Sequence, residues 1–185
     1  APDGIISFGQ GCEGEPSLAA DRIAEGIRRI RSVTARGQIN MNSNAGFPDG
    51  MKKIVDAGLD SLRVSIISAH AASYHAYYRA NYPLDNVKES LRYALDHGVY
   101  VSLNLLHFPG FTDRAEELRA WQEFFRALPV QMIQMRNLNI DPTLFLQTMP
   151  EAQSAPLGTR AFMEALHAEF PQLVIGSFSH YVTGH

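Results

Sequence analysis

The chain has 185 residues, of which 45% are hydrophobic and 19% are charged, with a formal net charge of −3 and a sequence pI near 6.2. This length and composition predict a single domain over residues 1–185, and the slight acidity argues against a nucleic-acid partner, because such proteins carry a basic surplus. No apolar run approaches the roughly 20 residues of a membrane span, and no secretory signal is visible. The single cysteine, Cys12, rules out a disulfide framework within the chain. We therefore expect a cytoplasmic protein with no membrane partner.

Strand-like and helix-like segments alternate along the chain. The apolar run at residues 5–8 predicts a strand, and the helical spacing after it predicts a helix over residues 17–31 with Ser17 as its N-cap. Further strands are expected at residues 38–44, 61–68, 99–107, 130–140 and 173–178. Further helices are expected at residues 49–57, 84–96, 113–128 and 159–170, with a helical turn at 73–79 and an irregular loop at 141–158. The helical spacing of the large apolar residues in the segment 113–128 marks a buried face, made of Trp121, Phe124, Phe125 and Leu128.

The alternation predicts an α/β fold, because helices that connect successive strands place those strands parallel. Two architectures are open at this point: a doubly wound sheet and a TIM-like barrel, complete or partial. Gly9, Gly11 and Gly14 spell the G-x-G-x-x-G pattern of dinucleotide-binding folds. However, Pro16 stands at the mouth of the following helix, and the strand at 38–44 ends in asparagine where such folds have an acid. The pattern alone is therefore weak evidence for a dinucleotide site.

Four of the predicted strands carry polar side chains on one face, whereas fully buried parallel strands are almost continuously apolar. The alternating polar positions are Asn40, Asn42 and Asn44; Arg63 and Ser65; Ser102 and Asn104; and Gln134 and Arg136, with Asn137 and Asn139 on the opposite face of the last strand. Each such group would cost about 1–3 kcal/mol if it were buried without a partner. These residues form either a buried structural network or the wet interior of a wide, partial barrel that holds a polar ligand, and we expect the second.

Four short motifs, taken in their order and spacing, resemble those of the radical S-adenosylmethionine (radical SAM) superfamily. They are Gly14-Glu15-Pro16, Asn42-Ser43-Asn44-Ala45-Gly46, Arg63-Val64-Ser65 and Phe108-Pro109-Gly110-Phe111-Thr112-Asp113. In the family the first is a Gly-Gly-Glu-Pro turn whose backbone holds the methionine amino end of SAM, although Glu13 here replaces its first glycine. The second resembles the family's Thr-Asn-Gly turn, the third a strand that contacts the ribose or the carboxylate, and the fourth a Pro-Gly-x-(Thr/Asn)-Asp turn common in activating enzymes.

The resemblance implies a partial TIM-like barrel of parallel strands with SAM as its cofactor. The residues expected to bind SAM are Gly14, Glu15, Asn42, Asn44, Arg63, Ser65, Asn104, His107 and Arg136. Among them, Gly14 and Glu15 are expected to offer carbonyl and carboxylate acceptors to the ammonium group of SAM.

The largest departure from the family is the missing Cys-x-x-x-Cys-x-x-Cys loop, which binds a [4Fe-4S] cluster. Cys12 is the only cysteine and follows the wrong strand. We therefore expect that the chain lacks the family's first strand and cluster loop and holds no metal itself, the [4Fe-4S] cluster belonging to a full-length parent. The strand at 5–8 would then form an open sheet edge, which predicts self-association through that strand.

These expectations describe the core SAM-binding part of a radical SAM enzyme, which cleaves SAM reductively at a [4Fe-4S] cluster to start radical chemistry; this chain alone is expected to be inactive. The substrate, whether a small molecule, a peptide or a protein, is expected at the barrel rim. The residues expected to contact it are Arg136, Asn137, Asn139 and the tyrosine patch Tyr74, Tyr77, Tyr78 and Tyr82. Two rival functions are a non-catalytic small-molecule-binding α/β domain and a cofactor-independent TIM-type lyase or isomerase. A Schiff-base form of the latter needs a lysine at a strand end, and Lys52, Lys53 and Lys88 all fall in predicted helices.

Overall fold

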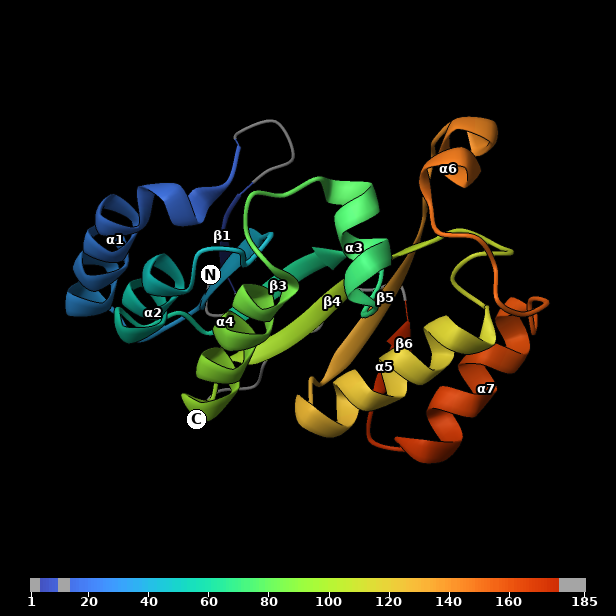
Figure 1. Cartoon of the computed structure of the whole chain (residues 1–185). Coiled ribbons are helices and arrows are strands. Elements are labelled where there is room, and N and C mark those ends of the chain that lie inside the picture. The colour runs from blue at the N-terminus through green and yellow to red at the C-terminus, as the bar shows by residue number, and fades with distance from the viewer. Residues whose placement is uncertain (1–3, 10–13, 177–185) are drawn as a thin grey trace. The chain divides into compact units, whose positions relative to one another are not determined.

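A computed structural model of the chain describes residues 4–9 and 14–176 (Figure 1). Its strands are β1 (Ile5–Phe8), β2 (Gln38–Ser43), β3 (Ser61–Ile66), β4 (Tyr100–His107), β5 (Met132–Asn137) and β6 (Val174–Gly176). Its helices are the 3-10 turn η1 (Pro16–Ala19), α1 (Ala20–Val33), α2 (Pro48–Asp56), α3 (Ala71–Tyr78), α4 (Leu84–Asp96), α5 (Ala115–Ala127), α6 (Pro142–Thr148) and α7 (Thr159–Glu169). Residues 177 and 178 of the last predicted strand lie outside the described residues.

The order of the strands decides between the two architectures that the sequence leaves open. Neighbours in the sheet are consecutive in the chain, in the order β1-β2-β3-β4-β5-β6, and the pairs β1–β2, β2–β3 and β5–β6 are parallel. A doubly wound sheet reverses its strand order at a switch point, whereas a βα barrel adds each strand beside the preceding one. The order in the described part of the chain therefore excludes a doubly wound sheet.

The described chain divides into two compact units. The first contains the residues up to Ser65 together with Asp85–Ser102, which include β1, β2, most of β3 and nearly all of α4. The second contains Ile66–Leu84 and the residues from Leu103 onward, which include most of β4, all of β5 and β6, and α3, α5, α6 and α7.

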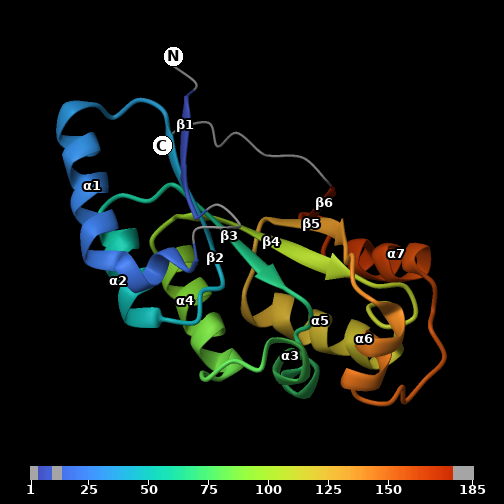
Figure 2. The same cartoon turned by 90° about the horizontal axis from the view of Figure 1, so that it is seen from above.

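In the first unit, the alternation of the strands separates an apolar face from a polar face. Ile39 and Leu62 are almost completely buried, and α1, α2 and α4 lie together on one side of β1 and β2 (Figure 2). The register pairs Ser7 with Asn40 and Asn40 with Ser61. Because residues that pair across parallel strands share a face, polar side chains continue over three strands on the side away from these helices.

The start of the first helix differs from the sequence expectation. Residues Pro16–Ala19 form η1, and α1 begins only at Ala20. Ser17 is not an N-cap: Glu15 caps η1, and its side chain accepts a hydrogen bond from Ser17 N at 3.0 Å. Pro16 explains the shift, because proline fits the first helical position, and the residue before it then becomes the cap.

The stretch at residues 141–158, expected to be irregular, contains α6. The Asp141 side chain accepts a hydrogen bond from Leu144 N at 2.9 Å, and Pro142 occupies the first turn. The helix is held by burial of Phe145, which belongs to an apolar cluster whose buried members are Ile67, Phe111, Phe145 and Met149. The helical turn expected at 73–79 is likewise longer, since α3 has 8 residues.

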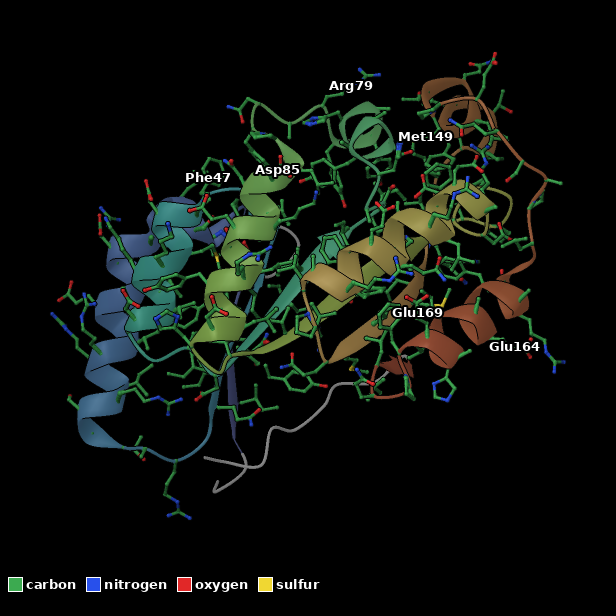
Figure 3. The ribbon with its side chains drawn as sticks, turned by 60° about the horizontal axis from the view of Figure 1, so that its bottom comes forward. Phe47, Arg79, Asp85, Met149, Glu164 and Glu169 are labelled. Carbon is green, nitrogen blue, oxygen red and sulfur yellow. The ribbon has the colours of Figure 1, made fainter. Side chains whose placement is uncertain are left out.

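The second unit buries the apolar face that was predicted for α5. Trp121, Phe124, Phe125 and Leu128 are all at most 4% exposed. At the end of α7, Glu169 accepts hydrogen bonds from Arg126 Nε at 2.6 Å and from Gln122 Nε2 at 2.7 Å. Figure 3 shows Glu169 where α7 meets α5, and Glu164 on the outward side of α7.

Candidate functional site

A carboxylate at the end of the glycine-rich turn ties two of the motifs together. Glu15 Oε1 accepts hydrogen bonds from Ser17 N at 3.0 Å, Ser17 Oγ at 2.6 Å and Ser43 Oγ at 2.6 Å. Glu15 Oε2 accepts a hydrogen bond from Asn44 N at 2.7 Å. With four donors around it, the carboxylate fixes the Gly-Glu-Pro turn against the end of β2. Glu15 therefore has a positioning role that the sequence did not reveal.

The turn after β2 is held in one conformation from several sides. Ser43 Oγ accepts a hydrogen bond from Ala45 N at 2.8 Å, and Asn44 Oδ1 accepts one from Gly46 N at 2.9 Å. From α4, Ser90 Oγ donates to Ala45 O at 2.7 Å. Ala45 has a φ of 56°, a left-handed conformation that costs a non-glycine residue about 1–3 kcal/mol. These hydrogen bonds maintain that conformation, so the turn presents its backbone groups in a fixed arrangement.

Asn42 holds the start of the glycine-rich turn. Its Nδ2 donates to Gly9 O at 3.0 Å and, over a longer distance, to Ser7 Oγ at 3.4 Å. Gly9 has a φ of 78°, and a Cβ at this position would lie 2.2 Å from Asn42 O, so only glycine fits there. Asn40 joins the same network, because its Nδ2 donates to Ser7 Oγ at 2.8 Å and its Oδ1 accepts a hydrogen bond from Ser61 Oγ at 2.9 Å.

These side chains belong to a polar strip on the face of the first unit that lies away from α1, α2 and α4. The polar strip consists of Ser7, Asn40, Asn42, Ser61, Arg63 and Ser65. In the register of β2 and β3, Asn42 stands opposite Arg63. Ser65 follows on the same face of β3, where it is exposed. Gly14 has a φ of 81°, and a Cβ there would meet no atom of the described residues within 4 Å. The first unit therefore contains a half-buried guanidinium, an exposed serine and an open glycine turn.

The remaining expected residues, in the second unit, divide between the two faces of the sheet. Asn104 is half-buried on β4, and Arg136 on β5 is exposed, with its Nη2 donating to Gln134 Oε1 at 3.3 Å. His107 stands three positions after Asn104 and so points to the opposite face of β4. There it is buried, with its Nε2 2.9 Å from Thr159 Oγ1 on α7, and burial lowers the pKa of His107. His107 therefore does not share a face of β4 with Asn104, and its role in SAM binding stays a prediction.

A buried carboxyl in the second unit escapes the sequence reasoning. Glu117 on α5 is 2% exposed and accepts hydrogen bonds from Ser68 Oγ and, at 2.7 Å, from Ser73 Oγ. Burial raises the pKa of Glu117, although the two hydroxyl donors act in the opposite direction. The carboxyl thereby holds the segment between β3 and α3. Its position four residues before Trp121, on the apolar face of the helix, is the signal by which it can be found.

The described residues hold no group of three or more His, Cys, Asp and Glu side chains that is placed to bind a metal ion. Cys12 lies outside the described residues. In the part of the chain that the structure describes, every helix is too short or too polar to cross a lipid bilayer.

Comparisons with known proteins bear on the motifs and on the fold. The family model of the radical SAM superfamily matches residues 4–121, which is more than half of the chain. The chain belongs to the radical SAM superfamily. The matched range contains the polar strip, Gly14 and the turn after β2, and it confirms the resemblance that the four motifs indicate. A comparison with curated protein sequences found no match.

Three solved structures have folds similar to this radical SAM domain. A domain of pyruvate-formate lyase-activating enzyme from Bacteroides vulgatus ATCC 8482 has a TM-score of 0.65 at 12% identity, over 95% of this chain and 99% of that one. Coproporphyrinogen III oxidase (HemN) from Escherichia coli, a radical SAM enzyme, has a TM-score of 0.63 at 14% identity, over 91% of this chain and 40% of that one. HydG, a maturase of the [FeFe]-hydrogenase, has a TM-score of 0.62 at 16% identity, over 94% of this chain and 40% of that one.

At these identities the likeness concerns the fold alone. It confirms the predicted class, an α/β fold with parallel strands that matches partial TIM barrels. The radical SAM domain described here spans less than half of HemN and of HydG.

Proposed function

We propose that this chain is the SAM-binding core of a radical SAM enzyme. The observation that carries the proposal is that the residues matched by the family model, 4–121, include the polar strip and the Gly-Glu-Pro turn, which meet at the carboxyl ends of β1 and β2. Ligands of parallel βα folds bind at these ends of the strands. A cytoplasmic location, expected from the single cysteine, belongs to the same proposal.

The polar strip has the donors and acceptors that SAM needs. The Arg63 guanidinium is suited to the carboxylate of the methionine part, because it donates in a planar fork. The Ser65 hydroxyl is exposed and can donate to the carboxylate or bond to a ribose hydroxyl. The carbonyl group of Gly14 is the acceptor that we assign to the ammonium group. This residue has a positive φ, and a Cβ there would meet no atom of the described residues within 4 Å, so the turn is open at this point.

Glu15, Asn42 and Asn44 act behind these contacts. Glu15 and Asn42 hold the two ends of the glycine-rich turn, and Asn44 closes the turn after β2. Their hydrogen bonds are made within the chain, so their contribution to SAM binding is to keep the backbone in place. Preorganisation of this kind lowers the entropic cost of binding.

Bound SAM supplies the 5′-deoxyadenosyl radical with which the family starts its chemistry. The [4Fe-4S] cluster needed for that cleavage is held by cysteines in the family, and this chain has one cysteine. The residues present therefore do not fit the cluster, and we assign its ligands to a longer parent protein. In this proposal the chain binds and orients SAM and does not itself carry out the reduction.

The lysine-dependent rival gains no support from the structure. All three lysines lie on helices and form ion pairs, which are Lys52–Glu89, Lys53–Asp21 and Lys88–Asp85. A lysine that forms a Schiff base needs a desolvated position near the substrate, where its pKa is lowered. Burial of that kind is absent at these three positions, since their side chains are 35%, 54% and 37% exposed.

Calorimetric titration of the chain with SAM tests the proposal. We expect Ser65→Ala to weaken SAM binding several-fold, from loss of about 1 kcal/mol of hydrogen bonding, and Arg63→Met to weaken it about tenfold or more. Ser32→Ala and Arg28→Met, which remove the same groups from the exposed side of α1, serve as matched controls and should bind SAM like the unaltered chain. Equal SAM affinity in all four variants, or no SAM binding by the unaltered chain, would overturn the proposal.

A further inference from the structure

Two neighbouring strands of the second unit carry a polar patch that the SAM site proposed above does not use. The hydrogen bond from Leu138 N to His107 O, 2.9 Å long, sets the register between β4 and β5. In parallel pairing this register places Asn104, three positions before His107, beside Gln134. Arg136 follows two positions later on the same face as Gln134. We call Asn104, Gln134 and Arg136 the β4–β5 patch.

The β4–β5 patch contains an acceptor that the protein does not satisfy. Asn104 Oδ1 is buried and has no hydrogen-bond partner among the described residues. Leaving a buried polar atom unpaired is costly, so most such atoms in folded proteins have a partner. A hydrogen-bond donor on a ligand would provide one for Asn104.

The same patch contains a cation that is anchored but not neutralised. Gln134 is fully buried, and its Oε1 accepts a hydrogen bond from Arg136 Nη2 at 3.3 Å, which holds the guanidinium against the strand. Arg136 is exposed, and no carboxylate of the described residues forms an ion pair with it. Its remaining N–H groups are suited to a carboxylate, which a guanidinium binds through two parallel hydrogen bonds.

An apolar wall borders the patch. Leu106 and Leu138 occupy the next positions on the same face and pack against the cluster that includes Phe111 and Phe145. The ring centroids of Phe108 and Phe145 lie 4.5 Å apart in this wall. A ligand held by the β4–β5 patch therefore has an apolar surface beside its polar groups.

We propose that the β4–β5 patch binds the substrate through an α-amino carboxylate group with an apolar side chain. Arg136 binds the carboxylate, Asn104 Oδ1 accepts a hydrogen bond from the amino or amide N–H, and the side chain lies against Leu106 and Leu138. Asn104 and Arg136 are diagonal neighbours on adjacent strands, and such neighbours stand about 7–8 Å apart. The amino carboxylate group of the ligand and the long side chain of Arg136 together span this distance. The inference rests on the proposed function, because the ligand is taken to be the substrate of that reaction. A free α-amino acid and the C-terminal residue of a peptide share this chemistry.

Four probes test the assignment by calorimetric titration of the chain. They are L-phenylalanine, 3-phenylpropionate, which lacks the amino group, phenethylamine, which lacks the carboxylate, and glycyl-L-phenylalanine, which is a peptide. Arg136→Gln should weaken binding of L-phenylalanine and 3-phenylpropionate about tenfold or more and leave phenethylamine unchanged. Asn104→Leu should weaken binding of L-phenylalanine and phenethylamine several-fold and leave 3-phenylpropionate unchanged. Arg160→Gln, which removes another exposed arginine, on α7, is the matched control.

The outcomes separate the sources of the ligand. Tighter binding of L-phenylalanine supports a free amino acid, and tighter binding of glycyl-L-phenylalanine supports a peptide terminus. The proposal is overturned if no probe binds up to about 10 mM, or if the two variants do not discriminate between the probes. It is also overturned if Arg136→Gln weakens SAM binding as strongly as L-phenylalanine binding, since the patch then belongs to the cofactor. Probe binding through both residues in a chain that does not bind SAM would contradict the proposed function and leave the amino-acid site standing.

Discussion

Replacement of Glu15 tests how the site is built. The carboxylate accepts four hydrogen bonds, from Ser17 N, Ser17 Oγ, Ser43 Oγ and Asn44 N, at distances of 2.6–3.0 Å. A hydrogen bond to a charged group contributes about 1.5–3 kcal/mol, but bonds that share one carboxylate are not additive. Because Glu15 is partly exposed, water replaces some of the lost bonds. We therefore expect Glu15→Ala to lower the free energy of unfolding by about 3 kcal/mol, and Glu15→Gln, which keeps one oxygen acceptor, by about half of that.

Urea unfolding followed by circular dichroism measures this difference. For a chain of this length, a loss of about 3 kcal/mol corresponds to a fall in Tm of about 6–12 °C. Glu25→Ala is the matched control, because Glu25 is exposed on α1 and pairs only with Arg29 one turn away among the described residues. Its effect should stay within about 0.5 kcal/mol. If Glu15→Ala unfolds at the same urea concentration as Glu25→Ala, the bridging role of Glu15 is wrong.

Three further predictions concern the turn, the buried carboxyl and the sheet edge. Gly9→Ala should lower the free energy of unfolding by clearly more than Gly14→Ala. Both glycines have a positive φ, but only at Gly9 would the added Cβ lie 2.2 Å from a carbonyl oxygen. Equal urea midpoints of the two variants would contradict this. Burial raises the pKa of Glu117 above its ordinary 4.5, so the folded chain binds this proton more tightly than the unfolded chain. The free energy of unfolding should therefore fall as the pH rises from about 4.5 through the pKa of Glu117 in the folded chain. Glu117→Gln should remove that fall, and identical pH profiles of unfolding in the two proteins would show that Glu117 is not its source. Ile5 and Ile6 are 48% and 47% exposed on the edge strand β1, so light scattering should show that the chain self-associates. The double variant Ile5→Lys with Ile6→Lys should abolish this self-association. A monomeric unaltered chain at high concentration would refute the expectation.

Periodicity predicted most of the architecture, because it depends on local spacing. The helix at 84–96 agrees with α4 at both ends, and the apolar spacing of α5 corresponds to its buried face. The prediction of an irregular loop over 141–158 is wrong for residues 142–148, which form α6. In fact the Asp-Pro pair that begins α6 is a helix-start signal, in which Asp141 caps and Pro142 fits the first turn.

The site was predicted less completely, because its decisive contacts join residues far apart in the chain. Alternation correctly grouped Asn40 and Asn42 on one polar face, as their bonds to Ser7 show. It does not reveal that Glu15 reaches Ser43, 28 residues away, because such a contact depends on how β2 ends beside the turn. The sequence does indicate, in contrast, that His107 and Asn104 lie on opposite faces of their strand, since residues three apart on a strand face opposite sides.

The central claim is that SAM binds at the polar strip of the first unit, and residue-specific NMR of the ¹⁵N-labelled chain tests it most directly. Addition of SAM should shift the amide signals of Gly14, Asn44 and Ser65 while leaving those of α7 in place. The groove in the second unit lined by Met163, His167 and Val174, with a volume of about 430 Å³, provides the contrast. Shifts confined to that groove, or no shifts at all, would contradict the account.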